Sequence, residues 1–285
     1  MTRRLCQFFA SLGVLGGSLS AQTLFGVTGS DGAASNLYTV NITTGATTLI
    51  GATGFSGVGA LAFAPNGTTL YGVANSGHRL ITINTSTGVG TAVSASATGT
   101  GNIADIAFRA DGVLFAAAGS DGVAPLYTIN TTTGIATLIG TMAGSGGGNA
   151  LAFNATGTLF LDANSGLYTV NPVTAATILV ATPNFGDPFS QSEFAGMKFH
   201  PSSGVLYGTT IGELGSLSTF TGSPTVTFLG STSVALEAVA FGTASAPPPP
   251  PPTGVPAPST LLLFGTGLAI AAAWSFLRGR RTMRT

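Results

Sequence analysis

The chain has 285 residues, including 42 glycines, and only 6% of its residues are charged. Lys, Glu and Gln, which favour helices, are scarce, so the composition favours strands and turns. Between residues 22 and 242, three cationic side chains (Arg79, Arg109 and Lys198) stand against nine acidic ones, a net charge of −6. This balance argues against nucleic-acid binding, which needs a basic surface.

The first 21 residues are predicted to be a secretory signal peptide. Arg3 and Arg4 form a positive n-region, which favours an ordinary export signal over a twin-arginine signal. Phe8 to Leu19 is apolar but too short to span a membrane, and Leu19-Ser20-Ala21 is a cleavage site. We expect export and cleavage by signal peptidase. Cleavage removes Cys6, the only cysteine, and leaves no disulfide and no cysteine-based metal site.

A repeat organises the next 220 or so residues. Its copies start 43, 46, 41 and 50 residues apart, a period typical of solenoids, propellers and arrays. The copies are LYTVNITTGATTLIG from Leu37, LITINTSTGVGTAV from Leu80, LYTINTTTGIATLIG from Leu126, LYTVNPVTAATILVA from Leu167 and a degenerate LSTFTGSPTVTFLG from Leu217. Each alternates with period two, turns at a Thr-Gly or similar pair and continues in β-branched residues, which predicts strand, turn, strand.

A second motif of the same kind lies between the copies. It begins at Ala60, Asp105, Ala150 and Gly196, and its turns contain Asn-Gly, Asp-Gly, Thr-Gly and Ser-Gly pairs. One unit is therefore four short strands in about 44 residues, the size of one propeller blade.

The two ends of the repeat region complement one another. Thr23 to Val27 matches the second strand of a unit, and Ala238 to Phe241 matches the first. Together they would complete one blade and remove free sheet edges, which a linear solenoid would not require. The sequence thus predicts an all-β protein, a propeller of about five four-stranded blades over residues 22–242. Thr182 to Phe194 fits the repeat least, and strands hidden there would raise the count.

The acidic residues are expected to gather on one face of this propeller. Loops joining second to third strands open on the same face as loops joining one blade to the next. Eight of the nine acids fall in or beside these loops, and Asp111 alone falls on the other face: the eight are Asp31, Asp105, Asp121, Asp162, Asp187, Glu193, Glu213 and Glu237.

This face has two interpretations. All of its acids except Asp162 are candidates for binding a cation such as calcium, or for a hydrogen-bonding rim around a polar polymer. Alternatively, Asp31 and Asp121 cap their own Ser-Asp-Gly turns and the other acids keep the surface soluble. No loop has the dense Asp-x-Asp-x-Asp spacing of a calcium loop. His78 and His200, the only histidines, fall on opposite faces and cannot share a metal.

One phenylalanine recurs in each blade, near the end of the first strand. The positions are Phe63, Phe108, Phe153, Phe199 and Phe241. Such regularity favours packing between blades over stacking on a ligand.

The composition changes after Gly242. Six prolines, Pro247 to Pro252, predict a semi-rigid linker within residues 243–254. Leu261 to Leu277 is an apolar run long enough to span a membrane with its flanks, and residues 278–285 are basic. The arginines, Arg278, Arg280 and Arg281 among them, should stay cytoplasmic and make this segment a tail anchor.

The tail, residues 255–285, resembles the PEP-CTERM sorting signal of Gram-negative bacteria. The resemblance rests on Val255, Pro256, Pro258, Ser259 and Thr260, followed by the apolar run and the arginine cluster. Ala257 departs from the family pattern, which usually has Glu there. The resemblance implies an inner-membrane-anchored precursor that an exosortase cleaves near the motif, and delivery to the cell surface or the exopolysaccharide matrix.

The sequence contains no convergent catalytic set, and we assign no catalytic residue. The favoured hypothesis is a non-enzymatic binding or scaffold protein, with exopolysaccharide or another protein as its ligand. The alternative is a cation-dependent extracellular hydrolase or lactonase that would use Glu193, Glu237, Asp105, Asn149 and Asp187. A purely structural role is the third hypothesis.

Overall fold

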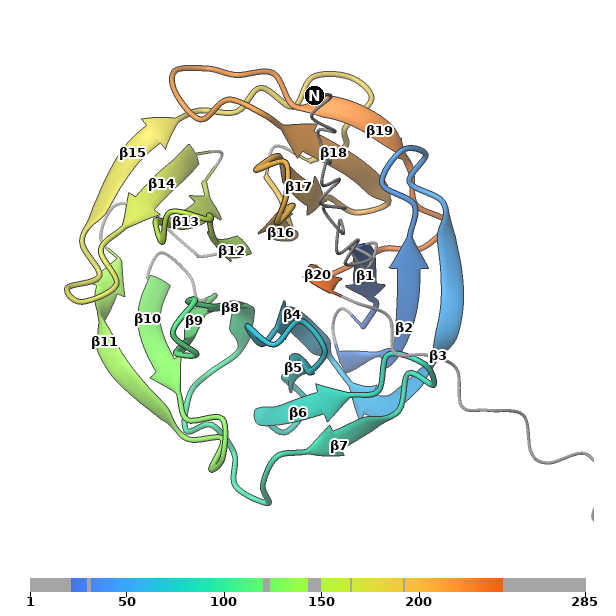
Figure 1. Cartoon of the computed structure of the whole chain (residues 1–285), viewed down its shortest axis with the longest axis vertical. Coiled ribbons are helices and arrows are strands. Elements are labelled where there is room, and N and C mark those ends of the chain that lie inside the picture. Colours follow the sequence, from blue (N-terminus) through green and yellow to red (C-terminus); the bar gives the residue numbers. More distant parts are fainter. Residues whose placement is uncertain are drawn as a thin grey trace, which may run out of the picture. The chain divides into compact units, whose positions relative to one another are not determined.

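A computed structural model describes residues 22–29, 32–119, 124–142, 150–164, 166–191 and 193–242, which form a five-bladed β-propeller (Figure 1). The predicted signal peptide, linker and sorting tail lie outside the described residues. No helix within the described ranges is long and apolar enough to cross a membrane.

Twenty strands build the propeller within the described ranges. In chain order they are β1 (Thr23–Val27), β2 (Ala34–Val40), β3 (Thr47–Ser56), β4 (Val58–Phe63), β5 (Leu70–Ala74), β6 (Arg79–Ile83), β7 (Gly90–Ala92), β8 (Ile103–Phe108), β9 (Leu114–Ala118), β10 (Ala124–Ile129), β11 (Ala136–Met142), β12 (Ala150–Phe153), β13 (Leu159–Ala163), β14 (Gly166–Val170), β15 (Thr177–Ala181), β16 (Gly196–Phe199), β17 (Leu206–Thr209), β18 (Glu213–Leu217), β19 (Thr227–Ser231) and β20 (Ala238–Gly242).

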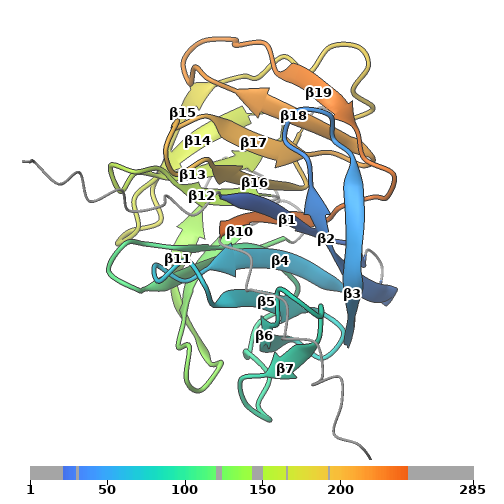
Figure 2. The same cartoon turned by 45° about the vertical axis from the view of Figure 1, so that its right-hand side comes forward.

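The strands form five antiparallel sheets of four. Blade 1 is β20-β1-β2-β3, blade 2 is β4 to β7, blade 3 is β8 to β11, blade 4 is β12 to β15 and blade 5 is β16 to β19. The first-named strand of each sheet borders the central channel and the last lies at the rim (Figures 1 and 2). The predicted number of blades and of strands in each blade is confirmed.

Blade 1 closes the ring with strands from both ends of the repeat region. β20 pairs with β1 so that Thr23 lies opposite Gly242 and Val27 opposite Ala238. The predicted closure is therefore confirmed, and the inner edge of β1 is covered. Residues 22 and 242 consequently emerge on the same face of the ring.

The hydrophobic core is divided into five clusters, one between each pair of neighbouring blades. The recurrent phenylalanines take part in every one of these interfaces. Each packs on an aromatic ring of the preceding blade, with centroids 5.3 to 5.5 Å apart: Phe63 on Phe25, Phe108 on Tyr71, Phe153 on Phe115, Phe199 on Phe160 and Phe241 on Tyr207. The predicted packing role is confirmed. The described members of all five clusters lie within residues 24–241.

We call the turns that join the third and fourth strands of a blade the outer turns. In four blades these turns share one shape, because each begins with an asparagine. The Asn130 Oδ1 accepts hydrogen bonds from the Thr132 and Thr133 backbone N–H groups, both at 2.9 Å. Asn41, Asn84 and Asn171 do the same in their own turns. These bonds satisfy backbone donors that the strands leave unpaired, which explains why the repeat carries Asn there.

The glycine that ends the repeat phrase has a packing role. A Cβ atom built on Gly51 would lie 2.2 Å from the Thr87 carbonyl oxygen, in the outer turn of the next blade. A Cβ on Gly230 would similarly meet the Thr44 carbonyl. The outer turn of one blade therefore lies directly on the outer strand of its neighbour, and only glycine leaves room for it.

Two details of the last blade differ from the prediction. Leu217 pairs with Leu206, as Val170 pairs with Leu159, so the degenerate copy begins at Leu214 and the proposed start at Leu217 is wrong by three residues. The cause is a longer turn between β18 and β19, which shifts the apparent alignment. The segment from Thr182 to Phe194 adds no strand among its described residues; Asn184 makes only an isolated bridge, to Thr225.

Candidate functional site

The central channel is where the blades differ most in chemistry. The inner strands end in an Ala-Phe pair in four blades, but the fifth has Lys198-Phe199. The pairing registers also make Asp105 equivalent to Ala60, Ala150, Gly196 and Ala238 in the other inner strands. Thus two charged residues replace small ones in an otherwise uniform channel lining.

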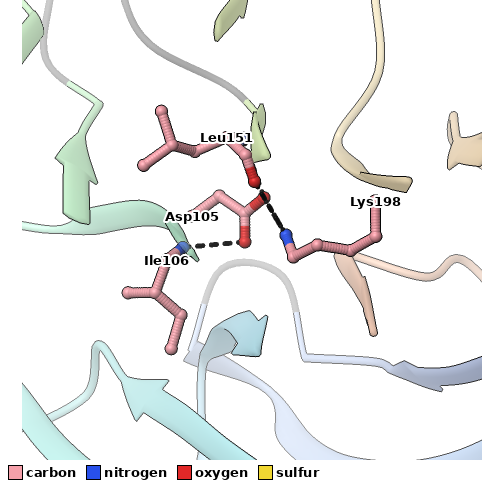
Figure 3. A network of polar contacts seen from close by, with 4 residues as sticks. All are labelled: Asp105, Ile106, Leu151 and Lys198. Atoms are coloured by element: carbon pink, nitrogen blue, oxygen red, sulfur yellow. Dashed lines mark hydrogen bonds and ion pairs between the residues drawn. The ribbon is translucent and has the colours of Figure 1, made fainter. Parts of the chain in front are cut away.

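These two residues bind one another. The Lys198 Nζ donates to Asp105 Oδ2 at 2.6 Å and to the Leu151 carbonyl oxygen at 3.0 Å (Figure 3). The Leu151 N–H in turn donates to Asp105 Oδ2 at 2.9 Å, and the Ile106 N–H donates to Oδ1 at 2.8 Å. Blades 3, 4 and 5 are therefore joined by a single polar network, which we call the channel ion pair.

The channel ion pair is buried. The side chain of Asp105 is fully inaccessible and that of Lys198 is 11% exposed. Burial raises the pKa of Asp105 to about 6, although the Lys198 charge and the hydrogen bonds oppose this rise. Burial lowers the pKa of Lys198, and Asp105 opposes that change. The attraction between the two opposite charges offsets part of the cost of burying them.

One opening of the channel is polar. A hollow of about 280 Å³ is lined by Gly29, Gly32, Gly57, Gly59, Asn75, Ser76, Asn102 and Glu237. A second hollow of about 230 Å³ shares Gly59, Asn75, Asn102 and Glu237 with the first. We call these two hollows together the polar mouth. The Asn75 amide is held in place, because its Nδ2 donates to the Ile103 carbonyl and its Oδ1 accepts from the Ile103 N–H, both at 2.9 Å.

The opposite opening is surrounded by the recurrent phenylalanines, and we call it the phenylalanine mouth. A cavity of about 200 Å³ is lined there by the five recurrent phenylalanines, Ala62, Ala107, Ala240, Pro201 and Lys198. The rings that pack between blades thus also surround the channel. Its one charged lining residue is also a member of the channel ion pair.

A second buried carboxyl group lies at the junction of blades 4 and 5. Asp162 is fully buried in β13, and its Oδ2 accepts from the Phe194 N–H at 2.6 Å. Its Oδ1 has no hydrogen-bond partner among the described residues. Burial raises the pKa of Asp162 to about 8; the Phe194 bond lowers it and the nearby Glu193 charge raises it. Asp162 is therefore mostly protonated and neutral at pH 7.

The structure disperses the acids that the sequence grouped as candidates. Asp31 and Asp121 lie outside the described residues, as does Asn149. Glu237 lines the polar mouth, whereas Asp105 forms an ion pair with Lys198.

The remaining candidates belong to blade 5 and to the connection that leads into it. Asp187 is exposed and Glu193 half-buried, both between β15 and β16. Glu213, at the start of β18, accepts hydrogen bonds from the Thr210 and Ser190 hydroxyls. Within the described ranges, no three His, Cys, Asp or Glu side chains gather closely enough to hold a metal ion.

Sequence reasoning counted Lys198 only as a charge and did not pair it with Asp105. The signal was present, since aligning the inner strands puts one Asp and one Lys in columns of Ala and Gly. Two opposite charges that each break a repeat, both predicted to line one channel, are a sign of a pair.

No family model matches the chain, and no curated protein matches it in sequence. Among solved structures, the propeller is similar to one described under "The de novo evolutionary emergence of a symmetrical protein is shaped by folding constraints". That match has 21% identity and a TM-score of 0.51, and covers 80% of this chain and 100% of that chain.

Two more distant likenesses have 11% identity. A chain of a nidogen/laminin complex gives a TM-score of 0.49, with 75% of this chain and 79% of that chain covered. A protein named as a gluconolactonase gives 0.48, with 78% and 86% covered. The match with a TM-score of 0.51 shows the propeller fold alone, and none of these structures carries an activity over to this chain.

Proposed function

We propose that this chain is an exported surface or matrix protein whose propeller is a non-enzymatic binding module for an uncharged, hydroxyl-rich polymer, with exopolysaccharide as the first candidate. The polar mouth is the observation that carries the proposal. Its amide, hydroxyl and carboxylate groups and its glycine backbones are suited to hydrogen-bonding sugar hydroxyls. The net charge of −6 over residues 22–242 disfavours anionic polymers.

The two ends of the sequence supply the cellular setting of this proposal. Signal peptidase would release the N-terminus, and the C-terminal segment would hold the precursor in the inner membrane. An exosortase would then cleave near Val255 to Thr260 and pass the propeller to the cell surface or the matrix. This part rests on the resemblance of the tail to the PEP-CTERM signal.

The alternative, a cation-dependent hydrolase, finds less support in the described residues. A calcium site needs several oxygen ligands at about 2.3–2.6 Å from one ion. Asp105 already neutralises Lys198, and Asp187 is exposed on the connection between β15 and β16. The binding module therefore remains our proposal.

Binding can be tested with the span Gln22–Ser245 and exopolysaccharide purified from a producing Gram-negative strain. Isothermal titration should show binding that Asn102→Ala and Glu237→Gln each weaken by at least fivefold. Asp111→Asn is the matched control, because it removes the same charge on the opposite face. Absence of binding by the unchanged span, or equal weakening by Asp111→Asn, would contradict the proposal.

Sorting needs a separate test, with the full chain expressed in a host with and without its exosortase. Mass spectrometry of the exported protein should show loss of the C-terminal segment only when the enzyme is present. Without the enzyme, the uncleaved precursor should stay in the inner-membrane fraction. An identical C-terminus in both hosts would refute exosortase processing while leaving the binding proposal untouched.

A further inference from the structure

The channel is closed directly below the polar mouth. The five equivalent positions at the beginnings of the inner strands are all buried: Ala60, Asp105, Ala150, Gly196 and Ala238. Neighbouring inner strands touch at this level, since a Cβ atom built on Gly196 would lie 2.6 Å from the Ala238 Cα. Among the described residues, none lines both the polar mouth and the phenylalanine mouth. A polymer therefore cannot thread the ring; it can enter the polar mouth with one end or lie across it.

The smaller hollow of the polar mouth lies on this closed level, and we call it the central hollow. Its walls include Gly59, Ala104, Ala195 and Glu237, each of which immediately precedes one of the buried positions. These four residues belong to the beginnings of the inner strands of blades 2, 3, 5 and 1. A group that enters this hollow of about 230 Å³ is surrounded by inner strands and can go no deeper.

The larger hollow, of about 280 Å³, extends from the centre towards blades 1 and 2, and we call it the outer hollow. Gly29 and Gly32, from the connection between β1 and β2, line it together with Ser76 from the turn between β5 and β6. Because Asn102 and Glu237 line both hollows, the two hollows are neighbours. Together they form a path that leads from the centre of the ring outward on one side.

The sizes and polar groups of the two hollows fit two consecutive sugar residues. A cavity of roughly 150 Å³ admits benzene, and a hexosyl residue has about twice as many heavy atoms, so each hollow has room for about one residue. The Asn75 amide lines both hollows and bonds the Ile103 backbone with one N–H and one lone pair. A second N–H and a second lone pair remain for a ligand. A Cβ atom on Gly59 would lie 3.0 Å from this Nδ2, so glycine leaves the amide uncovered.

We propose that the polar mouth binds one end of a polysaccharide chain, with the terminal residue in the central hollow and the next residue in the outer hollow. This inference rests on the polymer binding proposed above and adds which part of the polymer is bound. A residue inside a chain is linked on both sides, whereas the path described here leaves the central hollow on one side. A terminal residue is linked on one side only and has one more free hydroxyl to bond with Asn75, Asn102 or Glu237.

The number of binding sites per unit mass of polymer distinguishes end binding from binding along the chain. Exopolysaccharide from a producing Gram-negative strain is divided, and one half is shortened by sonication. The full chain of the protein, purified in a detergent without sugar groups, is titrated into equal masses of both samples by isothermal calorimetry. The number of sites should rise in proportion to the number of chain ends, so chains about ten times shorter should bind about ten times more protein.

The possible results separate this inference from the function on which it rests. An equal number of sites per unit mass in both samples would overturn end binding and leave polymer binding intact. Absence of binding to both samples would refute polymer binding itself, and end binding with it.

Oligosaccharides from partial acid hydrolysis of the same polymer, separated by size, test how many residues are bound. The affinity should rise at least tenfold from the monosaccharide to the disaccharide, because the second hollow is then filled. It should change by less than about twofold from the disaccharide to the tetrasaccharide. NMR titration measures the weaker ligands. A continued rise up to the tetrasaccharide would overturn the site of two residues.

Two variants separate the hollows. Of the two, Ala195 lines the central hollow alone, so Ala195→Leu should weaken binding of the monosaccharide and the disaccharide by at least tenfold. Ser76 lines the outer hollow alone, so Ser76→Ala should weaken the disaccharide about fivefold, the effect of one hydrogen bond, and leave the monosaccharide unchanged. Equal weakening of both sugars by Ser76→Ala would overturn the assignment of the outer hollow to the second residue. If Ala195→Leu does not fold, Ser76→Ala and the number of sites per unit mass still decide the outcome.

Discussion

Asp105 and Lys198, which are 93 positions apart in the sequence, form a 2.6 Å ion pair inside the ring and bind the backbone of a third blade between them. Most contacts of a propeller blade are with itself and its two neighbours. This pair instead connects blade 3 with blade 5, across the inner strand of blade 4 (Figure 3). Comparing a variant that lacks one member of the pair with a variant that lacks both separates the stability that the pair contributes from the cost of burying its two charges.

Asp105→Ala should lower the free energy of unfolding by about 3–5 kcal/mol, because Lys198 would remain buried without a counterion. The double variant Asp105→Ala with Lys198→Met should lose only about 1–2 kcal/mol, mainly from freed backbone groups. Alanine at position 105 matches the equivalent residues Ala60 and Ala150. Urea denaturation followed by circular dichroism measures both. If the double variant is less stable than Asp105→Ala, the loss in the single variant does not come from a buried Lys198 without its counterion.

Asp162 predicts a dependence of stability on pH. Its pKa in the folded state, about 8, is above the ordinary value of 3.8, so the folded protein holds a proton that the unfolded chain releases. This contribution is complete below about pH 4 and is lost as pH rises towards 8, by up to about 1.4 kcal/mol per pH unit. Asp162→Asn keeps an acceptor for the Phe194 N–H but does not ionise.

The expected result is that Asp162→Asn and the unchanged protein are similarly stable at pH 5, and that the variant is more stable at pH 8. Urea titrations at several pH values measure the difference. Asp105 has the same kind of shift, so both proteins should retain some dependence between pH 4 and 6. Parallel curves over the whole range would mean that Asp162 does not hold a proton in the folded state.

Gly51→Ala should destabilise the propeller by about 1–3 kcal/mol, since the new methyl group would meet the Thr87 carbonyl oxygen at 2.2 Å. Gly101→Ala is the control. Among the described residues, no heavy atom outside its immediate neighbours lies within 4 Å of a Cβ built there, so the change should be within about 0.5 kcal/mol. Thermal unfolding compares the two. Equal effects would indicate that the outer turn of blade 2 moves freely away from blade 1.

Calcium should leave the thermal unfolding of the span Gln22–Ser245 unchanged. A ligand that binds only the folded protein must raise its melting temperature. The described acids do not converge, so we expect the same curve in millimolar calcium and in EDTA. A rise of several degrees that EDTA reverses would overturn this expectation. It would restore the interpretation of the acid-rich face as a cation site and favour the hydrolase.

The fold could be predicted from the sequence because the residue pattern that specifies a blade is local and is repeated five times. Thr23 to Val27 and Ala238 to Phe241 each matched one strand of a unit, which was sufficient to predict closure. Leu217 was misplaced for the same reason: a longer outer turn in blade 5 moved the copy out of register, and only the pairing with Leu206 shows the correct alignment.

The site was less predictable, because its defining contacts are not local. The partner of Lys198 is set by the geometry of the ring, which places blades 3 and 5 within reach of one another. The burial of Asp162 likewise depends on how blade 5 covers β13. Loop position predicted which face an acid belongs to, but not whether its carboxylate would meet water, a lysine or nothing.

The pairing of β20 with β1 also constrains the order in which the protein can be made. β1 is among the first strands to emerge during synthesis, yet its inner partner is the last. Until residue 242 is available, the ring has an open seam, and blade 1 presents a bare backbone edge where Leu24 and Phe25 would meet β20. The propeller can therefore close only at a late step, when β20 pairs with β1. A chain interrupted before that step would expose an unpaired strand edge, which favours aggregation.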